Sequence, residues 1–492
     1  MNPLLAVTIV FVASVVIGLP LSFGLIASAL AGLYFSYDSL SALDQLSRVA
    51  GSEMDFIIVS LPLYILLGEL FMYSGVGAAG FRAAEVWLRR VPGGLGVAVI
   101  GASAPLAAVM GDTLASITTF GPTALAEAKR VGYSRKIVLG ALAASGTLGI
   151  LIPPSITMIL YSAATGVSVG ELFMAGFIPG LVLCLMMSAY IIWADVRERG
   201  RAASGPALAT AAPEGDLESI SHPPIIDGSP SGASSTLAAS PPTTALTLAE
   251  ATASPATLPD VDRAPVAAAA DAEPSRLRLT LGAIPALVSV VIVLGSIYAG
   301  FATPTESAAL GVMYALVLSM LVRRKGRGKE FLECLARAAR TSSMLLFLIV
   351  GAQLLSQVLV LENVPQDMGA FLTGLDIGRW GVFILVVLGL SVLGTVMNPG
   401  PIVLITMPLI FPVVEGLGFD GVWFGIIVVI ICELATLTPP IGVNLNVVQG
   451  ISDASFEEVM RASLPFQGVL VAAITLFTLI PEIVLWLPQT LK

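Results

Sequence analysis

The chain has 492 residues, of which 56% are hydrophobic and only 12% are charged, and its mean hydropathy is +0.93. A soluble domain carries about twice that charged fraction. The composition therefore excludes an ordinary soluble protein, and apolar runs of roughly 17 to 25 residues recur along the chain, long enough to cross a bilayer. A single histidine, His222, and three widely separated cysteines argue against a histidine metal site and against a disulfide framework.

The net charge of −9 is concentrated in one low-complexity segment. Residues 200–275 hold nine acidic residues and two arginines, and they are rich in Ala, Pro, Ser and Thr. Such a composition cannot bury enough apolar surface to fold. We therefore predict a disordered linker over 193–280 that tethers two membrane halves, 1–192 and 281–492; a partner-binding segment is the alternative.

An all-α membrane protein is predicted, and its elements follow one order in both halves. The first half should contain helices at 3–19, 22–40 and 55–76, a hairpin at 93–128, a broken helix at 136–162 and a helix at 171–192. The second half should contain helices at 281–300 and 304–322, an amphipathic stretch plus helix at 330–361, a hairpin at 380–416, a broken helix at 421–450 and a final helix at 463–487. The hairpin arms have only about 16 apolar residues, which suits re-entrant hairpins better than full crossings; short tilted helices are the alternative.

Basic residues predict the orientation of these elements. They cluster around residues 82–90, 129–136, 197–201 and 323–340. The segments predicted to lie outside, around 37–54, 161–171, 299–306, 361–380 and 412–421, hold only Arg48 and Arg379. By the positive-inside rule the clusters face the cytoplasm. The chain is thus predicted to be multi-pass, with both termini periplasmic and the linker cytoplasmic. The first apolar segment lacks a basic start and a cleavage site, so we interpret it as a helix and not as a signal peptide.

The two halves align without gaps, and every residue of the first half is as far along the chain from its match as Pro122 is from Pro408. We call this constant separation the repeat offset. Pro122 matches Pro408, Gly132 matches Gly418, and the agreements continue through 148–179 and 434–465. Gly132 lies inside and Gly418 outside on the predicted topology. The repeats are therefore predicted to be inverted, an arrangement that places a binding site near the middle of the bilayer and supports alternating access.

A Pro-Pro pair interrupts an apolar helix in each half, at 153–154 and at 439–440. Proline removes a helical hydrogen bond, and lipid cannot satisfy the freed groups, so such breaks persist only where they line a cavity or are packed in protein. Unwound carbonyls and helix ends at these breaks suit a small hard cation, while helix N-termini attract an anion.

Each break pairs with a hairpin turn to give a candidate ion and substrate site. The first group comprises Gly111, Asp112, Thr113 and Ser116 at the turn, with Ser145, Gly146, Thr147, Gly149, Pro153, Pro154 and Ser155 at the break. The second comprises Asn398, Pro399 and Gly400, with Glu433, Thr436, Thr438, Pro439, Pro440, Gly442 and Asn444. These oxygen-rich groups favour Na⁺ over a transition metal, one ion near Gly111, Thr113 and Gly149 and another near Asn398, Thr436 and Gly442. The alternative is that the small residues only allow close helix packing.

An ionisable side chain at membrane depth costs free energy, so acidic residues in apolar segments are candidates for function. Asp112 could bind a cation, carry a proton or cap the second hairpin arm. Glu433 adjoins the second break and is a candidate for an ion or proton role. Glu69 lies in a similar setting, while Glu306 follows Thr303-Pro304-Thr305 and could simply begin a helix.

The stretch GALAASGTLGILIPPSITMILYSAATGVSVGELFMAGFIPG at 140–180 closely resembles the large membrane subunit of tripartite ATP-independent periplasmic (TRAP) transporters, the DctM family. TPTESAA at 303–309 and FGIIVVIICELATLTPPIGVNLNVVQGIS at 424–452 support the resemblance. It covers nearly everything except the linker.

The resemblance implies the ion-transporter fold and a bacterial inner-membrane location. It implies Na⁺-driven import of a carboxylate-bearing organic solute by an elevator movement, with a small DctQ-like membrane subunit and a periplasmic DctP-like binding protein as partners. No cofactor, enzymatic activity or nucleic-acid partner is expected. The family usually has a Gly-Ser-Ser type turn where this chain has Gly111-Asp112-Thr113, so Asp112 could alter the first ion site.

Four alternative functions are compared with this one. A proton could replace Na⁺ as the coupling ion in the same fold. An intramembrane aspartyl protease would need two facing carboxylates, but Asp38, the partner available to Asp112, falls in a predicted external loop. A passive channel would not depend on an ion gradient. A primary pump is disfavoured because the sequence has no P-loop.

Overall fold

A computed structural model describes residues 2–36, 56–75, 80, 82–84, 86–87, 91–111, 113–204, 276–322 and 328–491. Asp38, Arg48, Asp112 and His222 lie outside these residues, as does the part of the predicted linker at 205–275. In the described residues every regular element is an α-helix, as the long apolar runs of the sequence predict.

The helices follow the predicted order in both halves. The first half contains α1 (Pro3–Ile17), α2 (Leu21–Ser36), α4 (Phe56–Ser74), α6 (Gly94–Met110), α7 (Thr113–Val131), α8 (Arg135–Ser145), α9 (Thr147–Leu151), α10 (Ile156–Thr165) and α11 (Val169–Ser204). The second contains α12 (Arg276–Tyr298), α13 (Pro304–Val322), α14 (Gly328–Leu361), α15 (Val364–Gly374), α16 (Gly378–Gly394), α17 (Pro399–Gly416), α18 (Gly421–Thr436), α19 (Val443–Ile451), α20 (Phe456–Leu479) and α21 (Glu482–Thr490).

Several of these helices are membrane-spanning by length and composition. Among the described residues, five meet both criteria, namely α11, α13, α14, α17 and α20. The bent pair formed by 135–151 and 156–165, with an angle of 45°, makes a sixth if counted as one span. The chain is therefore a multi-pass membrane protein.

Several helices differ in extent or number from the sequence prediction. Helix α11 continues to Ser204 and α12 begins at Arg276, so both ends of the range 193–280 are helical. The predicted loop around 361–380 contains α15. The stretch at 330–361 is one continuous helix, and the final helix at 463–487 is two helices, because Pro481 stands at the start of α21 where it cannot continue α20.

Glu306 helps to cap the start of α13. Its carboxylate accepts hydrogen bonds from the backbone N–H of Thr303 at 2.8 Å and from the Thr303 hydroxyl at 2.9 Å. The Thr303 hydroxyl in turn accepts from the N–H of Glu306 at 3.3 Å. This reciprocal arrangement is a capping box, which satisfies the exposed donors at the start of α13.

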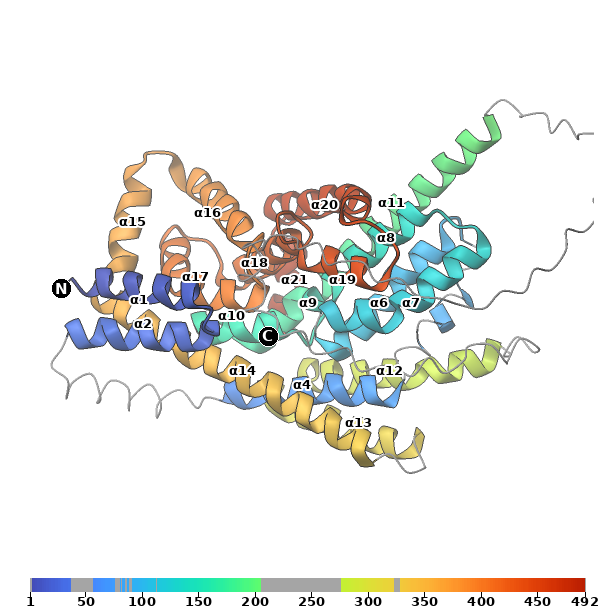
Figure 1. The fold of residues 1–492 in the computed structure, drawn as a ribbon, viewed down its shortest axis with the longest axis horizontal. Helices are drawn as coiled ribbons and strands as arrows, with labels where there is room; N and C mark the ends of the chain where they lie inside the picture. Colours follow the sequence, from blue (N-terminus) through green and yellow to red (C-terminus); the bar gives the residue numbers. More distant parts are fainter. Residues whose placement is uncertain are drawn as a thin grey trace, which may run out of the picture.

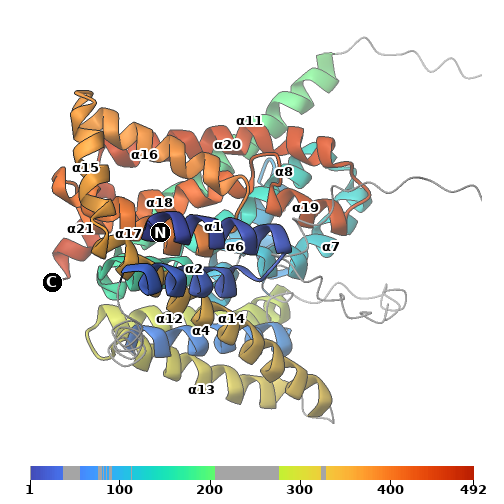
Figure 2. The same ribbon diagram turned by 60° about the vertical axis from the view of Figure 1, so that its left-hand side comes forward.

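Two groups of helices pack against each other. Helices α4, α12, α13 and α14 lie at the lower side of both views, and α16, α18 and α20 lie opposite them (Figures 1 and 2). Helix α2 packs on α14, and α1 packs on α2. We call α1, α2, α4, α12, α13 and α14 the outer layer, and α6–α10 with α16–α19 the inner layer. Tyr298 of the outer layer donates a hydrogen bond to the carbonyl of Phe173 in α11 at 3.0 Å, which joins α11 to that layer.

Helix boundaries in the two halves coincide at the repeat offset found in the sequence. Helices α17 and α18 begin where the repeat offset places the first residues of α7 and α8, and α19 ends where it places the last residue of α10. Both Pro-Pro pairs fall in the corresponding interruptions, between α9 and α10 and between α18 and α19, and both have a cis peptide bond. The interruption in the second half is longer, because residues 437–442 are outside a helix there.

Candidate functional site

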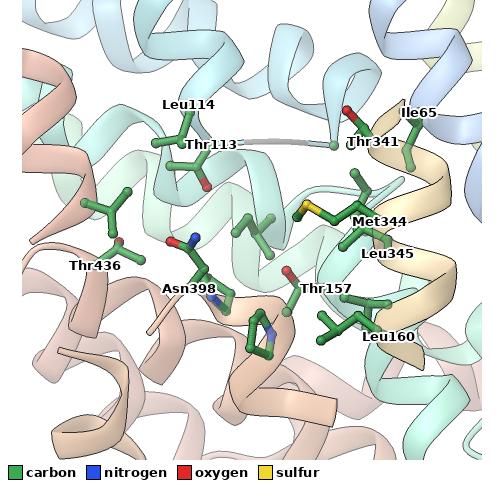
Figure 3. Close-up of a pocket in the computed structure, with 18 of the residues that line it drawn as sticks. Ile65, Thr113, Leu114, Thr157, Leu160, Thr341, Met344, Leu345, Asn398 and Thr436 are labelled. Atoms are coloured by element: carbon green, nitrogen blue, oxygen red, sulfur yellow. The ribbon is translucent and has the colours of Figure 1, made fainter. Parts of the chain in front are cut away.

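A cavity of about 340 Å³ lies between the two layers. Its inner wall comes from both hairpin turns and both interrupted helices, and its outer wall comes from α4, α14 and the residues that join α1 to α2. Figure 3 shows Thr113, Asn398 and Thr436 on one side of the cavity and Ile65 and Met344 on the other. Segments from the two halves of the sequence therefore form one site.

Four helix N-termini meet at this cavity. The first residues of α7, α10, α17 and α19 all line it, and each of these helices has nine or more residues. The N–H groups of a first helical turn have no partner within the helix, and the helix dipole adds partial positive charge there. The inner wall can therefore attract an anion without a basic side chain.

Close backbone packing holds the first hairpin turn against the first interrupted helix. Gly111 has a φ of +62°, and a Cβ there would lie 3.1 Å from the carbonyl oxygen of Pro154. Gly146 lies against Thr113, and a Cβ on Gly146 would overlap the Thr113 methyl group. Glycine is thus required at 111 by conformation and at 146 by space.

A buried carboxyl group connects the first turn to the second half. The Thr113 hydroxyl donates a hydrogen bond to Oε1 of Glu433 at 3.0 Å, and Glu433 is only 1% exposed. Glu433 lies in the last turn of α18, three residues before Thr436, which lines the cavity. Glu433 itself does not line the cavity, and the hydrogen bond from Thr113 joins it to a cavity residue.

Asn444 offers a buried oxygen at the same cavity. Its Nδ2 donates to the carbonyl of Ala143 at 3.4 Å, which orients the side chain. Its Oδ1 is buried and accepts no hydrogen bond from any described residue. Because a buried polar atom without a partner is costly, this oxygen is a candidate ligand for a cation.

The second turn begins α17 with a proline in the first helical turn. Asn398 is the N-cap of α17, Pro399 follows it, and the Asn398 side chain caps no N–H of the helix. Its carboxamide therefore remains available, and Figure 3 shows it pointing into the cavity. Gly400 also lines the cavity.

The proline pairs act through the carbonyls that precede them. Pro153 and Pro154 have no N–H to donate to the carbonyls of Gly149 and Ile150, which lie four residues earlier. In the second half, Pro440 likewise has none for Thr436. The two interruptions thus leave carbonyl oxygens within buried segments, where a cation can satisfy them.

The cavity includes only part of the predicted site. The residues that line it are Gly111, Thr113, Asn398, Pro399, Gly400, Thr436 and Asn444. Those that do not line it are Ser116, Ser145, Gly146, Thr147, Gly149, Pro153, Pro154, Ser155, Glu433, Thr438, Pro439, Pro440 and Gly442.

Several of the predicted hydroxyl groups form local hydrogen bonds with the backbone, those of Thr436 and Thr438 included. The hydroxyls of Ser145 and Thr147 donate to carbonyls three residues earlier, at 2.8 and 2.7 Å. Ser155 caps α10 by accepting from the N–H of Met158 at 3.3 Å. The hydroxyl groups of these residues are thus already engaged by the backbone around the breaks.

The outer wall was missed by the sequence prediction. Thr341, Met344 and Leu345 of α14 line the cavity, and so does Glu69 of α4. The sequence could have identified Glu69, because an acidic residue in apolar surroundings is unusual. It could not have identified the α14 residues, since Thr, Met and Leu are common in any membrane helix.

Comparison with known proteins agrees with this architecture. The family described as "Tripartite ATP-independent periplasmic transporter, DctM component" matches residues 8–483. The chain is 30% identical over 468 residues to the C4-dicarboxylate TRAP transporter large permease protein DctM of Pseudomonas aeruginosa, which covers 95% of this chain and 93% of the relative. It is 26% identical to the sialic acid TRAP transporter large permease protein SiaM of Vibrio cholerae, over 96% and 95% of the two chains.

A solved structure shares the fold. The YdaH transporter of Alcanivorax borkumensis aligns over 98% of both chains with a TM-score of 0.50 and 13% sequence identity. Interrupted helices that enclose a cavity within a bundle of membrane helices thus define the chain as a membrane transport protein. More narrowly, it belongs to the DctM family and is the large permease subunit of a TRAP transporter. Its relatives are named as permeases, which fits the expectation that it is not an enzyme and does not favour the protease alternative.

Proposed function

We propose that this permease imports an organic carboxylate by Na⁺-coupled secondary transport, with the inner layer moving as an elevator against the outer layer. The observation that carries this proposal is the convergence of four helix N-termini and the buried, unpartnered Oδ1 of Asn444 on one cavity. The first feature suits an anion and the second suits a cation, so a single site can couple the two.

Sodium is the coupling ion that the available ligands favour. Carbonyl, hydroxyl and carboxamide oxygens surround the interruptions, and hard oxygen ligands prefer alkali and alkaline-earth ions. No cluster of three or more His, Cys, Asp or Glu side chains suited to a metal occurs among the residues described. One ion would lie near Gly111, Thr113 and Gly149, and a second near Asn398, Thr436 and Gly442.

The helix termini and the named relatives support a negatively charged organic solute. The first turns of α7, α10 and α19 offer N–H groups that favour negative charge, and α17 adds the N–H of Gly400, because its neighbours Pro399 and Pro401 have none. Relatives are named for C4-dicarboxylate, isethionate and sialic acid, which are all organic anions. This shared chemistry supports an organic anion as the solute here.

The movement is inferred from the relation between the halves. Helix boundaries that coincide at the repeat offset support two structural repeats, and the basic clusters support their opposite orientation. In such folds one bundle moves against another around a site near the middle of the bilayer. The cavity lies between the two layers, where that movement would open it to either side in turn.

The cellular context is proposed from the family. We place the chain in the bacterial inner membrane, with both termini periplasmic and the segment between the halves cytoplasmic. A small DctQ-like membrane subunit and a DctP-like periplasmic binding protein would complete the transporter. An isethionate relative named DctMQ is longer, and this chain covers 64% of it.

Uptake into proteoliposomes tests the coupling ion. With both partner proteins present, we expect solute uptake under an inward Na⁺ gradient and none under an equal K⁺ gradient. Uptake under both gradients would contradict Na⁺ coupling.

A proton is the alternative coupling ion, because Glu433 is a buried carboxyl group hydrogen-bonded to a cavity residue. In that case an inward pH gradient alone should drive uptake, and a Glu433→Gln variant should lose the pH dependence. Retained Na⁺ dependence in this variant would assign Glu433 to positioning Thr113.

A further inference from the structure

We propose that the solute is an organic monocarboxylate with an apolar body, and that the cavity disfavours dicarboxylates. This inference rests on the proposed carboxylate transport and narrows its substrate class. The observation behind it is a polar cluster, Thr113, Asn398 and Thr436, at one side of the cavity, facing a mostly apolar outer wall in which Thr341 and Glu69 are the larger polar side chains (Figure 3).

The inner wall provides one polar end. Thr113, Asn398 and Thr436 lie together there, next to the four helix N-termini. A single carboxylate placed between the two hairpin turns can accept hydrogen bonds from the Asn398 carboxamide and from free N–H groups of the first helical turns. The inner wall therefore suits one anionic group near the coupling ions.

The outer wall is mostly apolar. Ile65 and Met72 of α4 and Met344, Leu345 and Leu348 of α14 face the same cavity. Met344 remains 59% exposed although it lines the cavity, so the described side chains leave most of it uncovered. A hydrocarbon chain or ring on the solute would cover this surface and gain the free energy of apolar burial.

The charges at the cavity are unfavourable for a second anionic group. Among the described residues, Glu69 is the one ionisable side chain that lines it. Nε of Arg337 lies 3.0 Å from the Glu69 carboxylate, so the nearby positive charge is already neutralised. A second carboxylate pointing at the outer wall would meet Met and Leu side chains beside Glu69, and would lose its hydration without gaining a cation.

The size of the cavity also fits a compact solute. Its volume of about 340 Å³ is at the lower end of the range for small-molecule sites.

The contribution of the solute's chain length to its affinity can be estimated, because each methylene group removed from water strengthens binding about fourfold.

Competition binding tests the inference. The full-length chain in lipid nanodiscs would be incubated with radiolabelled hexanoate in a buffer that contains Na⁺. Unlabelled butanoate, hexanoate, hexanedioate and butanedioate would then compete with the bound label. Hexanoate and hexanedioate have the same chain and differ by one carboxylate. We expect displacement to improve about fourfold per methylene among the monocarboxylates. Hexanedioate should be about tenfold weaker than hexanoate or worse, because its second charge is buried without a partner. Empty nanodiscs and neutral hexanamide correct for partition into lipid.

Two variants of outer-wall residues, with one matched control, test whether the outer wall sets the preference. Met344→Gln keeps the side-chain length but makes this wall polar, and it should remove most of the gain with chain length. Met313→Gln on α13 is the matched control, because Met313 is 64% exposed and does not line the cavity. Glu69→Gln should reduce the difference between hexanedioate and hexanoate, since Arg337 then becomes available to the second carboxylate.

The other outcomes are distinct. If either dicarboxylate displaces the label in Na⁺ as well as hexanoate does, the inference is wrong and the proposed carboxylate transport stands. If none of the four acids binds in Na⁺, both the inference and the proposed carboxylate site fail.

Discussion

At the scale of single residues, two glycines hold the first hairpin turn in place. Gly111 takes a positive φ of +62°, whereas Gly146 has ordinary helical geometry and is needed only for space. A side chain at 146 would therefore overlap Thr113 first, with a second close contact to Ile117, and would act through Thr113 on the hydrogen bond to Glu433. This makes Gly146 a clean probe of the turn.

We predict that Gly146→Ala lowers both stability and uptake. The added methyl group would overlap Thr113, and overpacking of this kind costs about 1–3 kcal/mol. Na⁺-dependent uptake should fall roughly tenfold. Uptake and thermal unfolding in detergent measure the two effects.

Gly389→Ala is the matched control for this substitution. Gly389 lies in α16 with no atom within 4 Å of its Cβ position, so the added methyl group should be tolerated. Normal uptake by Gly146→Ala would mean that the contact with Thr113 does not position the turn.

Residues differ in how readily the sequence identified them. Gly111, Asn398 and the prolines stood out because their backbone properties are rare inside apolar segments. The hydrogen bond between Thr113 and Glu433 joins positions 320 residues apart, and no local pattern predicts such a pair. The outer wall had a signal only at Glu69, because a charge in a membrane segment is costly.

At the scale of elements, the interruptions follow from missing N–H groups. The prolines end α9 and α18, and α10 and α19 begin again with their N-termini at the cavity. Interruption therefore supplies both free carbonyls and free N–H groups at one place. An uninterrupted helix would supply neither.

We predict that replacing Pro153-Pro154 or Pro439-Pro440 with Ala-Ala abolishes transport while membrane insertion continues. Alanine restores the N–H donors and has the highest helix propensity, so the free carbonyls would be lost. Losing one ligand to a cation should cost at least about 1.4 kcal/mol, a tenfold loss of affinity. Uptake rates and the Na⁺ concentration for half-maximal uptake measure this.

Pro179→Ala and Pro465→Ala provide the controls for the proline pairs. Both prolines lie inside helices, α11 and α20, that do not line the cavity. These variants should transport normally. Equal uptake by the Ala-Ala variants and these controls would refute the role of the interruptions.

At the scale of the whole molecule, the second hairpin arms of the two halves, α7 and α17, should end on opposite sides of the membrane. Lys129 near the end of α7 and Glu415 near the end of α17 correspond to each other at the repeat offset, and both are exposed. Lys129 is bound to Asp453 at 2.8 Å, which lowers the pKa of Asp453 below its usual value, but an exposed pair of this kind adds little stability. Both positions are therefore suitable for labels.

We predict that a membrane-impermeant thiol reagent labels Glu415→Cys in intact cells and labels Lys129→Cys only after permeabilisation. The parent should carry Cys184→Ser, because Cys334 and Cys432 are buried while Cys184 is partly accessible. Labelling of both positions from the same side would contradict the inverted orientation of the halves.

The sequence by itself determined the membrane class, the order of the helices, the repeat offset between the halves and the two interruptions. These features depend on hydrophobic length, on the lack of an N–H in proline and on the repeat in the chain, all of which are local or periodic. It did not determine that α11 and α12 extend into the segment between the halves, because a polar sequence can continue a helix once the helix has begun. Only the tertiary structure decided which residues of the two halves meet: Thr113 with Glu433, Asn444 with the carbonyl of Ala143, and α14 as the apolar wall. Such contacts depend on how packed helices from distant parts of the chain fit together, and side-chain packing leaves no periodic signal in the sequence.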